Sequence, residues 1–418
     1  MMFLQYAIWG AWLPLLWPFL KRHREMDAEQ IGDIFAIGAV GAIVAPFIAG
    51  QISDRWFATE KFLAFSHLAG GLLIWQLASL ENYTAFLGFS LAYSLLYSPT
   101  MPLTNSLAFH HLPDRDRDFG QVRVWGTLGW IAAGIAIGQW LLHRHTPIGA
   151  DTATVLATQA SGMADAFKLS GGLGILMGIF CFTLPHTPPS QGKSANATGE
   201  ALSEIRRQPL FTLFLLAVPI SCIHQFYFVH TADFLGAIQA QAGEAGEFIK
   251  NINSIFGVGG AGLMTIGQMS EIVVLSLIPL FVKSASRKAL LACGLVAYAA
   301  RMALFAYADQ VGLGGVLAGV AFHGPAFGFF IFLAFMIVDE EVSKDVKASA
   351  QSLFNLVIVG IGVIVGSKIA TKATEYATVG GEISYRTLFS YPMWASLACL
   401  AWLLLSYPSK KTRRDTPI

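Results

Sequence analysis

A carboxylate in the middle of an apolar stretch is the residue with the clearest chemical potential in this sequence. Glu271 ends the segment Gln268-Met269-Ser270-Glu271, inside an apolar run from about residue 261 to 282. In a helix it would lie roughly 15 Å from either end of that run. A carboxylate at such depth in a membrane usually marks a proton or ion pathway, because it must be neutral, paired or facing water. Alternatively, it is a buried carboxyl that only hydrogen-bonds a neighbouring helix.

Other polar side chains have spacings that could build a binding site. Gln268 and Glu271 are three residues apart, so their amide and carboxyl can face one cavity. Arg123, Thr127 and Trp130 follow at i, i+4 and i+7 and would line one helix face. Such a face suits a polar ligand with a ring, because arginine supplies directional donors and the indole stacks. Alternatively, Arg123 is a snorkelling arginine at the end of its span.

A third set of residues combines rings with polar groups in the second half of the sequence. His323 and Phe327 are four residues apart and share a helix face, and His224-Gln225 with Phe228 line one turn. His323 is either a hydrogen-bonded packing residue or a titrating ligand group, because histidine changes charge near neutral pH. Phe327 by itself would more often belong to a packed core.

The composition is that of an all-α integral membrane protein. Of its 418 residues, 55% are hydrophobic and 13% are charged, with a mean hydropathy of +0.57. Soluble proteins have about 25% charged residues. Apolar stretches of roughly 20 residues recur along the chain, and we expect about twelve transmembrane helices. The net charge of +1 does not indicate nucleic-acid binding. Four cysteines show neither metal-binding nor disulfide spacing: Cys181, Cys222, Cys293 and Cys399.

One polar segment divides the chain. Residues 186–208 are rich in proline, serine and alanine and separate the sixth apolar stretch from the seventh. We therefore expect a six-helix half over 1–185, a cytoplasmic linker over 186–208, a second six-helix half over 209–407 and a cytoplasmic tail over 408–418. Two such halves around a site near the bilayer midplane are the plan of the major facilitator superfamily.

Lysine and arginine predict the orientation of the helices. Most of the 27 basic residues fall in cytoplasmic segments if both termini are cytoplasmic. Lys21, Arg22 and Arg24 disagree, because they follow the first apolar stretch and would face outward. The other segments outweigh them, so we expect a multi-pass protein of the bacterial inner membrane with both termini in the cytoplasm.

A short segment after the second apolar stretch could act as a conformational latch. Residues 50–55 end in Asp54-Arg55 and resemble the Gly-x-x-x-Asp-Arg loop of the major facilitators. There an acid and a base are thought to hold helices together in the outward-facing state. The alternative is a solvated Asp-Arg turn, since surface charge pairs are common. The sequence has no Walker loop and no nucleophile–base–acid set, so we expect neither an enzyme nor a bound cofactor or metal.

The segment 123–129, with the pattern Arg-x-Trp-Gly-Thr-x-Gly, resembles the bacterial nucleoside:proton symporter family of the major facilitators. Further segments resemble this family in the same order along the chain: 4–13, 183–186, 268–271 with Gln-x-Ser-Glu, 301–307 and 348–351. The resemblance covers nearly the whole chain. It implies a twelve-helix secondary transporter that imports nucleosides by proton symport with alternating access. Its expected partners are a nucleoside, protons and the lipid bilayer, and a monomer is expected.

The resemblance also implies a nucleoside site. Phe228 stands where the family can have asparagine, and Gly328 falls on an aspartate of the family, so one proton or ribose acceptor is missing. Glu271 and His323 are then the candidates for proton coupling. The implied substrate-binding residues are Arg123, Thr127, Trp130, Gln225, Phe228, Gln268, Glu271, His323 and Phe327.

Other interpretations stay open at this point. Arg301 in the ninth span could neutralise a carboxylate of a neighbouring helix or only hold helices together. A major facilitator fold could also carry sugars or other polar metabolites, because a fold does not fix a substrate. A membrane sensor that binds without transport is a further alternative. Transport measurements with nucleosides separate the three.

Overall fold

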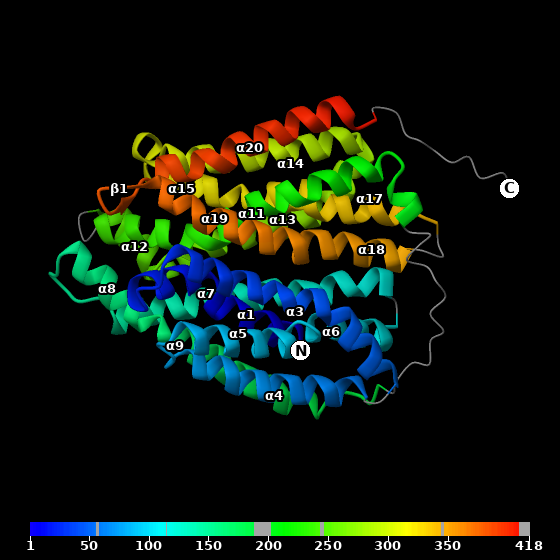
Figure 1. Ribbon diagram of the computed structural model, residues 1–418, viewed down its shortest axis with the longest axis horizontal. Coiled ribbons are helices and arrows are strands. Elements are labelled where there is room, and N and C mark those ends of the chain that lie inside the picture. Colours follow the sequence, from blue (N-terminus) through cyan, green and yellow to red (C-terminus); the bar gives the residue numbers. More distant parts are fainter. Residues whose placement is uncertain (56–57, 114, 188–201, 243–245, 344–346, 409–418) are drawn as a thin grey trace.

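The computed structural model is a bundle of long helices with one short hairpin (Figure 1). It describes the chain apart from residues 56–57, 114, 188–201, 243–245, 344–346 and 409–418. The side chains of three further segments also lie outside this description: 45–55, 115–117 and 348–349.

The first part of the chain forms one group of helices, which runs from blue to green in the lower part of Figure 1. Its elements are α1 (Met2–Trp12), η1 (Leu13–Leu15), α2 (Leu16–Pro18), η2 (Phe19–His23), α3 (Ala28–Arg55), α4 (Thr59–Leu77), α5 (Tyr83–Tyr97), α6 (Thr100–His111), α7 (Arg115–Arg144), α8 (Thr152–Gly162) and α9 (Ala164–Cys181). Pro14 lies in η1 and Pro99 separates α5 from α6. Proline has no N–H to donate, which explains why these helical passes change geometry or break there.

The second part of the chain forms another group, which runs from green to red in the upper part of Figure 1. Its elements are α11 (Leu210–Ala242), α12 (Glu247–Phe256), α13 (Ala261–Ser284), α14 (Arg287–Ala306), α15 (Ala308–Ala321), α16 (His323–Ala326), η3 (Phe327–Phe332), α17 (Leu333–Glu341), α18 (Lys347–Asn355), η5 (Leu356–Ile361), α19 (Gly362–Ala377), β1 (Thr378–Val379), β2 (Glu382–Ile383) and α20 (Tyr385–Ser406). The two strands pair antiparallel, with Thr378 opposite Ile383. Gly380 and Gly381 form their turn at φ values of 62° and 88°, where other residues are strained.

The described part of the chain has nine helical segments that are long and apolar enough to cross a membrane. The sequence predicts about twelve, and helices α3, α4 and the α5–α6 pair occupy the other three places. The α5–α6 pass is split at Pro99 into pieces that are each short. The count of twelve therefore stays a prediction, whereas the all-helical membrane architecture is confirmed.

We name the two ends of the bundle from the segments that lie there. The linker end, at the right of Figure 1, carries α17, α18 and the end of α20. The far end, at the left, carries α8, α12 and β1. At the linker end, Glu60 of α4 accepts one hydrogen bond from the backbone N–H of Thr187 and contacts His186 Nδ1 at 2.8 Å. His111 Nε2 contacts Thr187 Oγ1 at 2.9 Å. The start of the expected linker is thus held against α4 and α6.

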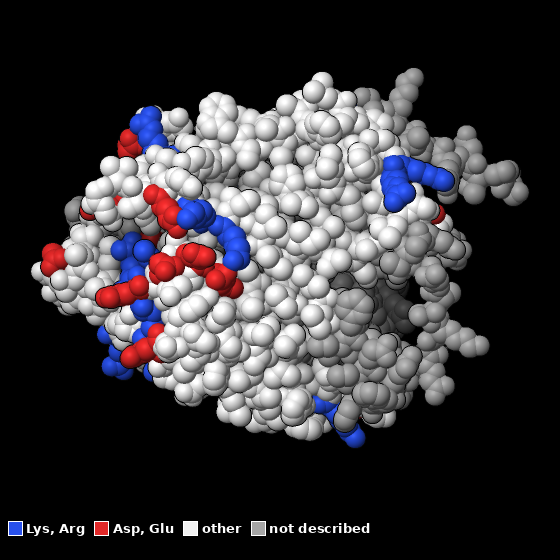
Figure 2. Space-filling model, in the orientation of Figure 1, with Lys and Arg blue, Asp and Glu red and all other residues white. Residues whose placement is uncertain are grey.

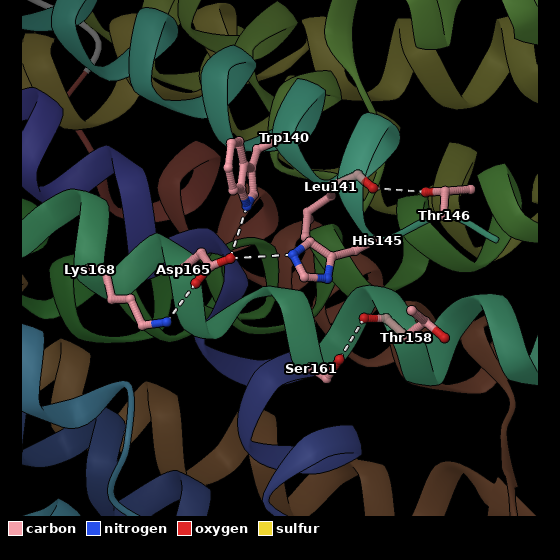
Figure 3. Close-up of polar contacts among 8 residues, drawn as sticks. All are labelled: Trp140, Leu141, His145, Thr146, Thr158, Ser161, Asp165 and Lys168. Atoms are coloured by element: carbon pink, nitrogen blue, oxygen red, sulfur yellow. Dashed lines mark hydrogen bonds and ion pairs between the residues drawn. The ribbon is translucent and has the colours of Figure 1, made fainter.

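At the far end, one carboxylate ties the end of α7 to α9 (Figure 3). Asp165 accepts hydrogen bonds from Trp140 Nε1 at 2.9 Å and from Lys168 Nζ at 2.8 Å. His145 Nε2 lies 3.3 Å from the same carboxylate. All these residues belong to the first group, so the cluster stiffens one group and does not join the two.

The two groups touch at the far end. Val258 N–H donates to the carbonyl of Gly138 at 3.0 Å, which joins α7 to the loop before α13. Gly257 has φ of 73°, and a Cβ there would lie 1.9 Å from the Gly138 backbone, so only glycine allows the approach. Trp17 meets His230 edge-on with ring centroids 4.7 Å apart. Toward the linker end, Figure 2 shows the surface hollowed between the groups.

Charged residues also join the groups at the far end, where Figure 2 shows them gathered. Arg22 of η2 binds Asp233 of α11 with two hydrogen bonds, of 2.6 and 3.2 Å. Tyr385 of α20 donates to the same carboxylate at 3.0 Å. A second ion pair links Asp33 of α3 to Lys368 of α19.

Contacts of this kind explain two members of the basic cluster that disagreed with the predicted orientation, Arg22 and Arg24. Arg22 is half-buried against Asp233, whose side chain keeps only 4% of its surface. Arg24 donates to the carbonyl of Ala78 at 2.7 Å and lies over the Phe19 ring, with its Cζ 4.9 Å from the centroid. Both arginines therefore have structural roles in this segment that are independent of how it faces the membrane.

Candidate functional site

Close packing of α13 against α16 brings Glu271 and His323 together. Ser270 Oγ donates a hydrogen bond of 2.6 Å to the carbonyl of Ala321, the last residue of α15. A Cβ on Gly324 would lie 2.5 Å from the Ser270 carbonyl group, so a larger residue would push the helices apart. Glycine at this position thus sets His323 beside the Glu271 carboxyl.

A chain of polar contacts runs from Glu271 through His323 to Arg301 of α14. His323 Nε2 lies 3.5 Å from Glu271 Oε2, and His323 Nδ1 lies 3.0 Å from Arg301 Nη1. The Glu271 side chain keeps 14% of its surface, whereas that of His323 keeps 3% and Arg301 is completely buried. Glu271 is therefore the member of this chain that is most open to the surroundings.

Aromatic rings surround His323. Tyr227 stacks on its imidazole with centroids 4.8 Å apart, and Phe327 lies parallel to it at 6.1 Å. Phe228 meets it edge-on at 6.4 Å. His224 stacks on it at 5.5 Å and contacts the Tyr298 hydroxyl, with 2.9 Å between Nδ1 and the oxygen. His323 and Phe327 lie side by side, as their spacing predicts.

The first group contributes rings and a guanidinium from α1 and α7. Arg123 lies over the Tyr6 ring, with its Cζ 4.0 Å from the centroid. Trp130 is buried and meets Trp9 edge-on, with centroids 5.7 Å apart. Arg123 is half-buried and its guanidinium packs against an aromatic ring. A snorkelling arginine would not need such a contact, because its guanidinium only has to reach the membrane–water interface.

The two groups meet at this place. Trp130 of α7 and Phe228 of α11 have ring centroids 6.3 Å apart, in an edge-on arrangement. Arg123 and Glu271 lie close enough to interact electrostatically, and Tyr6 interacts with both. The structure therefore collects a cation, a carboxyl and several rings from both groups around one location.

The predicted amides lie beside this location in different surroundings. Gln225 is buried, and its Oε1 accepts a hydrogen bond of 3.3 Å from Ser367 of α19. Gln268 is buried, and its Oε1 has no hydrogen-bond partner among the described residues. A buried amide oxygen without a partner is uncommon in folded proteins, so it is available to a ligand donor. Thr127 is half-buried on α7, one turn before Trp130.

Gly328 and the Asp54-Arg55 segment do not contribute described side chains to this location. Gly328 faces α13: a Cβ there would lie 2.7 Å from Val274 Cγ1, so the aspartate of the resembled family would not fit without a shift. The Asp54 and Arg55 side chains lie outside the described residues, and the proposed latch stays a prediction. Within the described residues, no group of His, Cys, Asp or Glu could hold a metal ion.

Sequence reasoning missed several site residues. Tyr6 and Trp9 of α1 contact Arg123 and Trp130. Tyr6 and Trp9 are three residues apart, so they share a helix face with aromatic side chains. This pattern alone does not indicate a site, because aromatic residues on an apolar helix usually pack in the core. Tyr227 had no distinguishing signal, because its role depends on contact with Arg301, whose Cζ lies 4.4 Å from its ring centroid.

Trp130 gives a first test of this location. Trp130→Ala should weaken substrate binding about fivefold, because an aromatic contact contributes on the order of 1 kcal/mol. Trp125→Ala on the same helix is a matched control, since Trp125 is 58% exposed. Binding is measured by isothermal titration calorimetry on variants that elute as wild type in size exclusion. Unchanged affinity in a well-folded Trp130→Ala protein would show that the indole does not contact the substrate.

Comparison with known proteins shows which family this chain resembles. Residues 1–412 match the family described as nucleoside H+ symporter. The chain is 34% identical over 386 residues to the transporter YegT of Escherichia coli (strain K12), covering 88% of this chain and 82% of that protein. It is 28% identical over 406 residues to the nucleoside permease NupG of the same organism, covering 93% and 89%.

Solved structures share the fold. The crystal structure of the nucleoside transporter NupG matches with a TM-score of 0.80 at 24% identity, covering 97% of this chain and 98% of that one. The D-xylose–proton symporter matches with a TM-score of 0.66 at 14% identity, covering 97% and 96%. The major facilitator fold and the family predicted from the sequence are both confirmed.

Proposed function

The chain belongs to the nucleoside H+ symporter family and is a transporter rather than an enzyme, and we propose that its nucleoside binds between the two helix groups. The observation that carries this proposal is that Trp130 contacts Phe228 across the interface and that Arg123 lies close enough to Glu271 to interact electrostatically. Import by proton symport is the activity of the family. In the proposed site, a carboxyl that can carry a proton lies next to rings that can hold a base.

Each substrate-binding residue has a role that fits a nucleoside. Trp130, Phe228 and Phe327 offer faces and edges to a planar base. Gln268 Oε1 has no hydrogen-bond partner among the described residues and can accept from a base or ribose donor, as can the Glu271 carboxylate. Donors to the ligand come from Arg123, Thr127 and Gln225. Glu271 and His323 are the two candidates for the coupled proton.

An alternating-access mechanism requires that one end of the bundle faces the cytoplasm and the other faces the outside. We propose that the linker end faces the cytoplasm, with the halves 1–185 and 209–407 joined by residues 186–208 and followed by the tail 408–418. The hollow at the linker end and the closed far end then correspond to an inward-facing state. Binding of substrate and proton would favour an occluded state, and rocking of the halves would release both inside. The proposed setting is the bacterial inner membrane, with the protein as a monomer and both termini cytoplasmic.

The contact of Arg22 with Asp233 should hold the far end closed in this state. Arg22→Gln leaves a nearly buried carboxylate without its cation, which costs on the order of a few kcal/mol. The variant should therefore favour opening at the far end. Ala153 of α8 and Phe248 of α12 are both exposed and can carry spin labels once the native cysteines are replaced. Double electron–electron resonance then measures the distance between the two labels, one on each helix group.

Arg144→Gln is a matched control for this experiment. Arg144 lies at the end of α7 and stacks on Trp140 within the same group. The distance distribution between the labels should lengthen for Arg22→Gln and stay as in the parent protein for Arg144→Gln. An unchanged distribution for Arg22→Gln would show that this ion pair does not control closure.

The second proposed latch is Asp54-Arg55 at the end of α3. Closure of the linker end in the outward-facing state would bring this pair against neighbouring helices. Asp54→Asn should then favour the inward-facing state, opposite to the effect of Arg22→Gln, in the same distance measurement.

Counterflow in proteoliposomes tests the proposed function directly. Vesicles loaded with unlabelled uridine or adenosine should take up the labelled nucleoside from outside, and vesicles loaded with xylose should not. A porter of sugars would exchange xylose and ignore nucleosides. A sensor would bind a nucleoside in calorimetry without any exchange. Either result would contradict the proposal.

A further inference from the structure

Arg301 is a completely buried cation with few partners. Among the described residues it makes no ion pair with a carboxylate, and its Nε and Nη2 atoms have no hydrogen-bond partner. The rings of Tyr227 and Tyr298 lie 4.4 and 5.0 Å from its Cζ. Its one hydrogen-bond contact within the described part of the chain is that of Nη1 with His323 Nδ1, at 3.0 Å. Burying a charge is costly, so a residue kept in this position needs a physical reason.

The contact determines where His323 carries its proton. A guanidinium has donors only and stays charged, so Arg301 donates and His323 Nδ1 must accept. A neutral imidazole with a free Nδ1 has its proton on Nε2, and Nε2 is the atom that faces Glu271. A second proton on Nδ1 would set N–H against N–H at 3.0 Å, with two positive charges side by side.

Apart from Glu271, the groups around His323 do not offset that repulsion. From α11 it faces His224 and Tyr227, and from α14 it faces Arg301, with Tyr298 reached through His224. Tyr227 and Tyr298 are neutral rings, His224 contacts the Tyr298 hydroxyl, and Arg301 is a cation. Glu271 of α13 is the one carboxylate in contact with the imidazole in the described structure, at 3.5 Å. Arg123 of the first group acts on that same carboxylate.

We propose that Arg301 is a positioning residue that holds His323 neutral, with its Nε2 proton toward Glu271, so that Glu271 alone takes up the coupled proton. The inference rests on the proposed function, because this proton drives nucleoside import. His323 then serves as a fixed donor. Its distance of 3.5 Å from Oε2 is longer than an ordinary hydrogen bond, so the carboxyl remains free to exchange a proton with the cavity.

Nuclear magnetic resonance can test this role of Arg301 without a transport measurement. The chain has ten histidines, and the ¹⁵N signals of His323 are the ones missing from the spectrum of His323→Gln. In the wild type these signals should show a neutral imidazole protonated at Nε2 from about pH 5 to 8, the range in which histidine ordinarily titrates. In Arg301→Met the same signals should titrate within that range, and in Arg301→Lys they should stay as in wild type. A wild-type His323 that is protonated at both nitrogens would overturn the proposal.

Transport supplies a second test that does not depend on folding of an Arg301 variant. His323→Gln keeps an N–H donor but cannot titrate. Because His323 also belongs to the proposed substrate site, accumulation and exchange should both fall in this variant, but the ratio of gradient-driven accumulation to nucleoside exchange should equal that of wild type. A variant that exchanges nucleoside but no longer accumulates it would show that His323 carries the proton, and would overturn the proposal. If glutamine prevents folding, judged by thermal unfolding, His323→Asn takes its place in the same measurement.

Different results would contradict nucleoside transport and the positioning role of Arg301. If wild type shows no nucleoside counterflow, the proposed function is wrong, while the ¹⁵N spectra still decide the state of His323. If wild type accumulates nucleoside and the His323 signals titrate in the presence of Arg301, the positioning role is wrong and the proposed function stands.

Discussion

Replacing Glu271 with glutamine should abolish the accumulation of nucleoside that a proton gradient drives, while exchange of nucleoside continues. Glutamine resembles the protonated carboxyl in shape and keeps a hydrogen-bonding group, but it cannot release a proton. A gradient of one pH unit supplies about 1.4 kcal/mol, which allows about tenfold accumulation for one proton per nucleoside. The wild type should approach this limit, and Glu271→Gln should only equilibrate.

The measurement compares uptake into proteoliposomes, acidic outside, with counterflow at equal pH. Glu341→Gln is a control, because this carboxylate lies at the linker end of α17, away from the site. The outcome that contradicts the prediction is full accumulation by the Glu271 variant. In that case the coupled proton is carried elsewhere, or the protein accumulates nucleoside by another gradient.

The second large effect is expected for Arg123→Lys. Lysine keeps the charge but loses the planar fork and its stacking on the Tyr6 ring, 4.0 Å from the guanidinium carbon. Hydrogen bonds to charged groups contribute about 1.5–3 kcal/mol, so nucleoside binding should weaken by about tenfold to a hundredfold. Counterflow at limiting substrate should fall in proportion.

Arg144→Lys is the matched control for this substitution. Arg144 also lies over an aromatic ring of α7, with its Cζ 5.5 Å from the Trp140 centroid, but at the far end. Its replacement should leave nucleoside binding unchanged. If lysine serves as well as arginine at position 123, the snorkelling interpretation is correct and the substrate does not contact this guanidinium.

The sequence predicts those features that depend on local periodicity. Hydropathy indicates the helical membrane architecture, and three- and four-residue spacings indicate that Gln268 and Glu271, or His323 and Phe327, share faces. These predictions need only the geometry of a single helix. The polar linker likewise follows from composition, and its first residues pack against α4 and α6.

Contacts between helices could not be predicted in the same way. Glu271 meets His323 because Gly324 allows α16 to approach Ser270, which no spacing along one helix reveals. Arg22 meets Asp233 across more than two hundred residues of chain. The π-helical geometry of η3 also shifts the face of every residue after Phe327, so the regular stripe does not continue there.

Proton uptake driven by nucleoside tests the central claim most directly. Reconstituted vesicles contain a pH-sensitive dye, and a nucleoside is added outside at equal pH on both sides. The interior should acidify in vesicles with the wild type and should not in vesicles with Glu271→Gln, although both exchange labelled nucleoside. Acidification that persists in the Glu271 variant, or none in a wild type that exchanges nucleoside, would contradict proton coupling through Glu271.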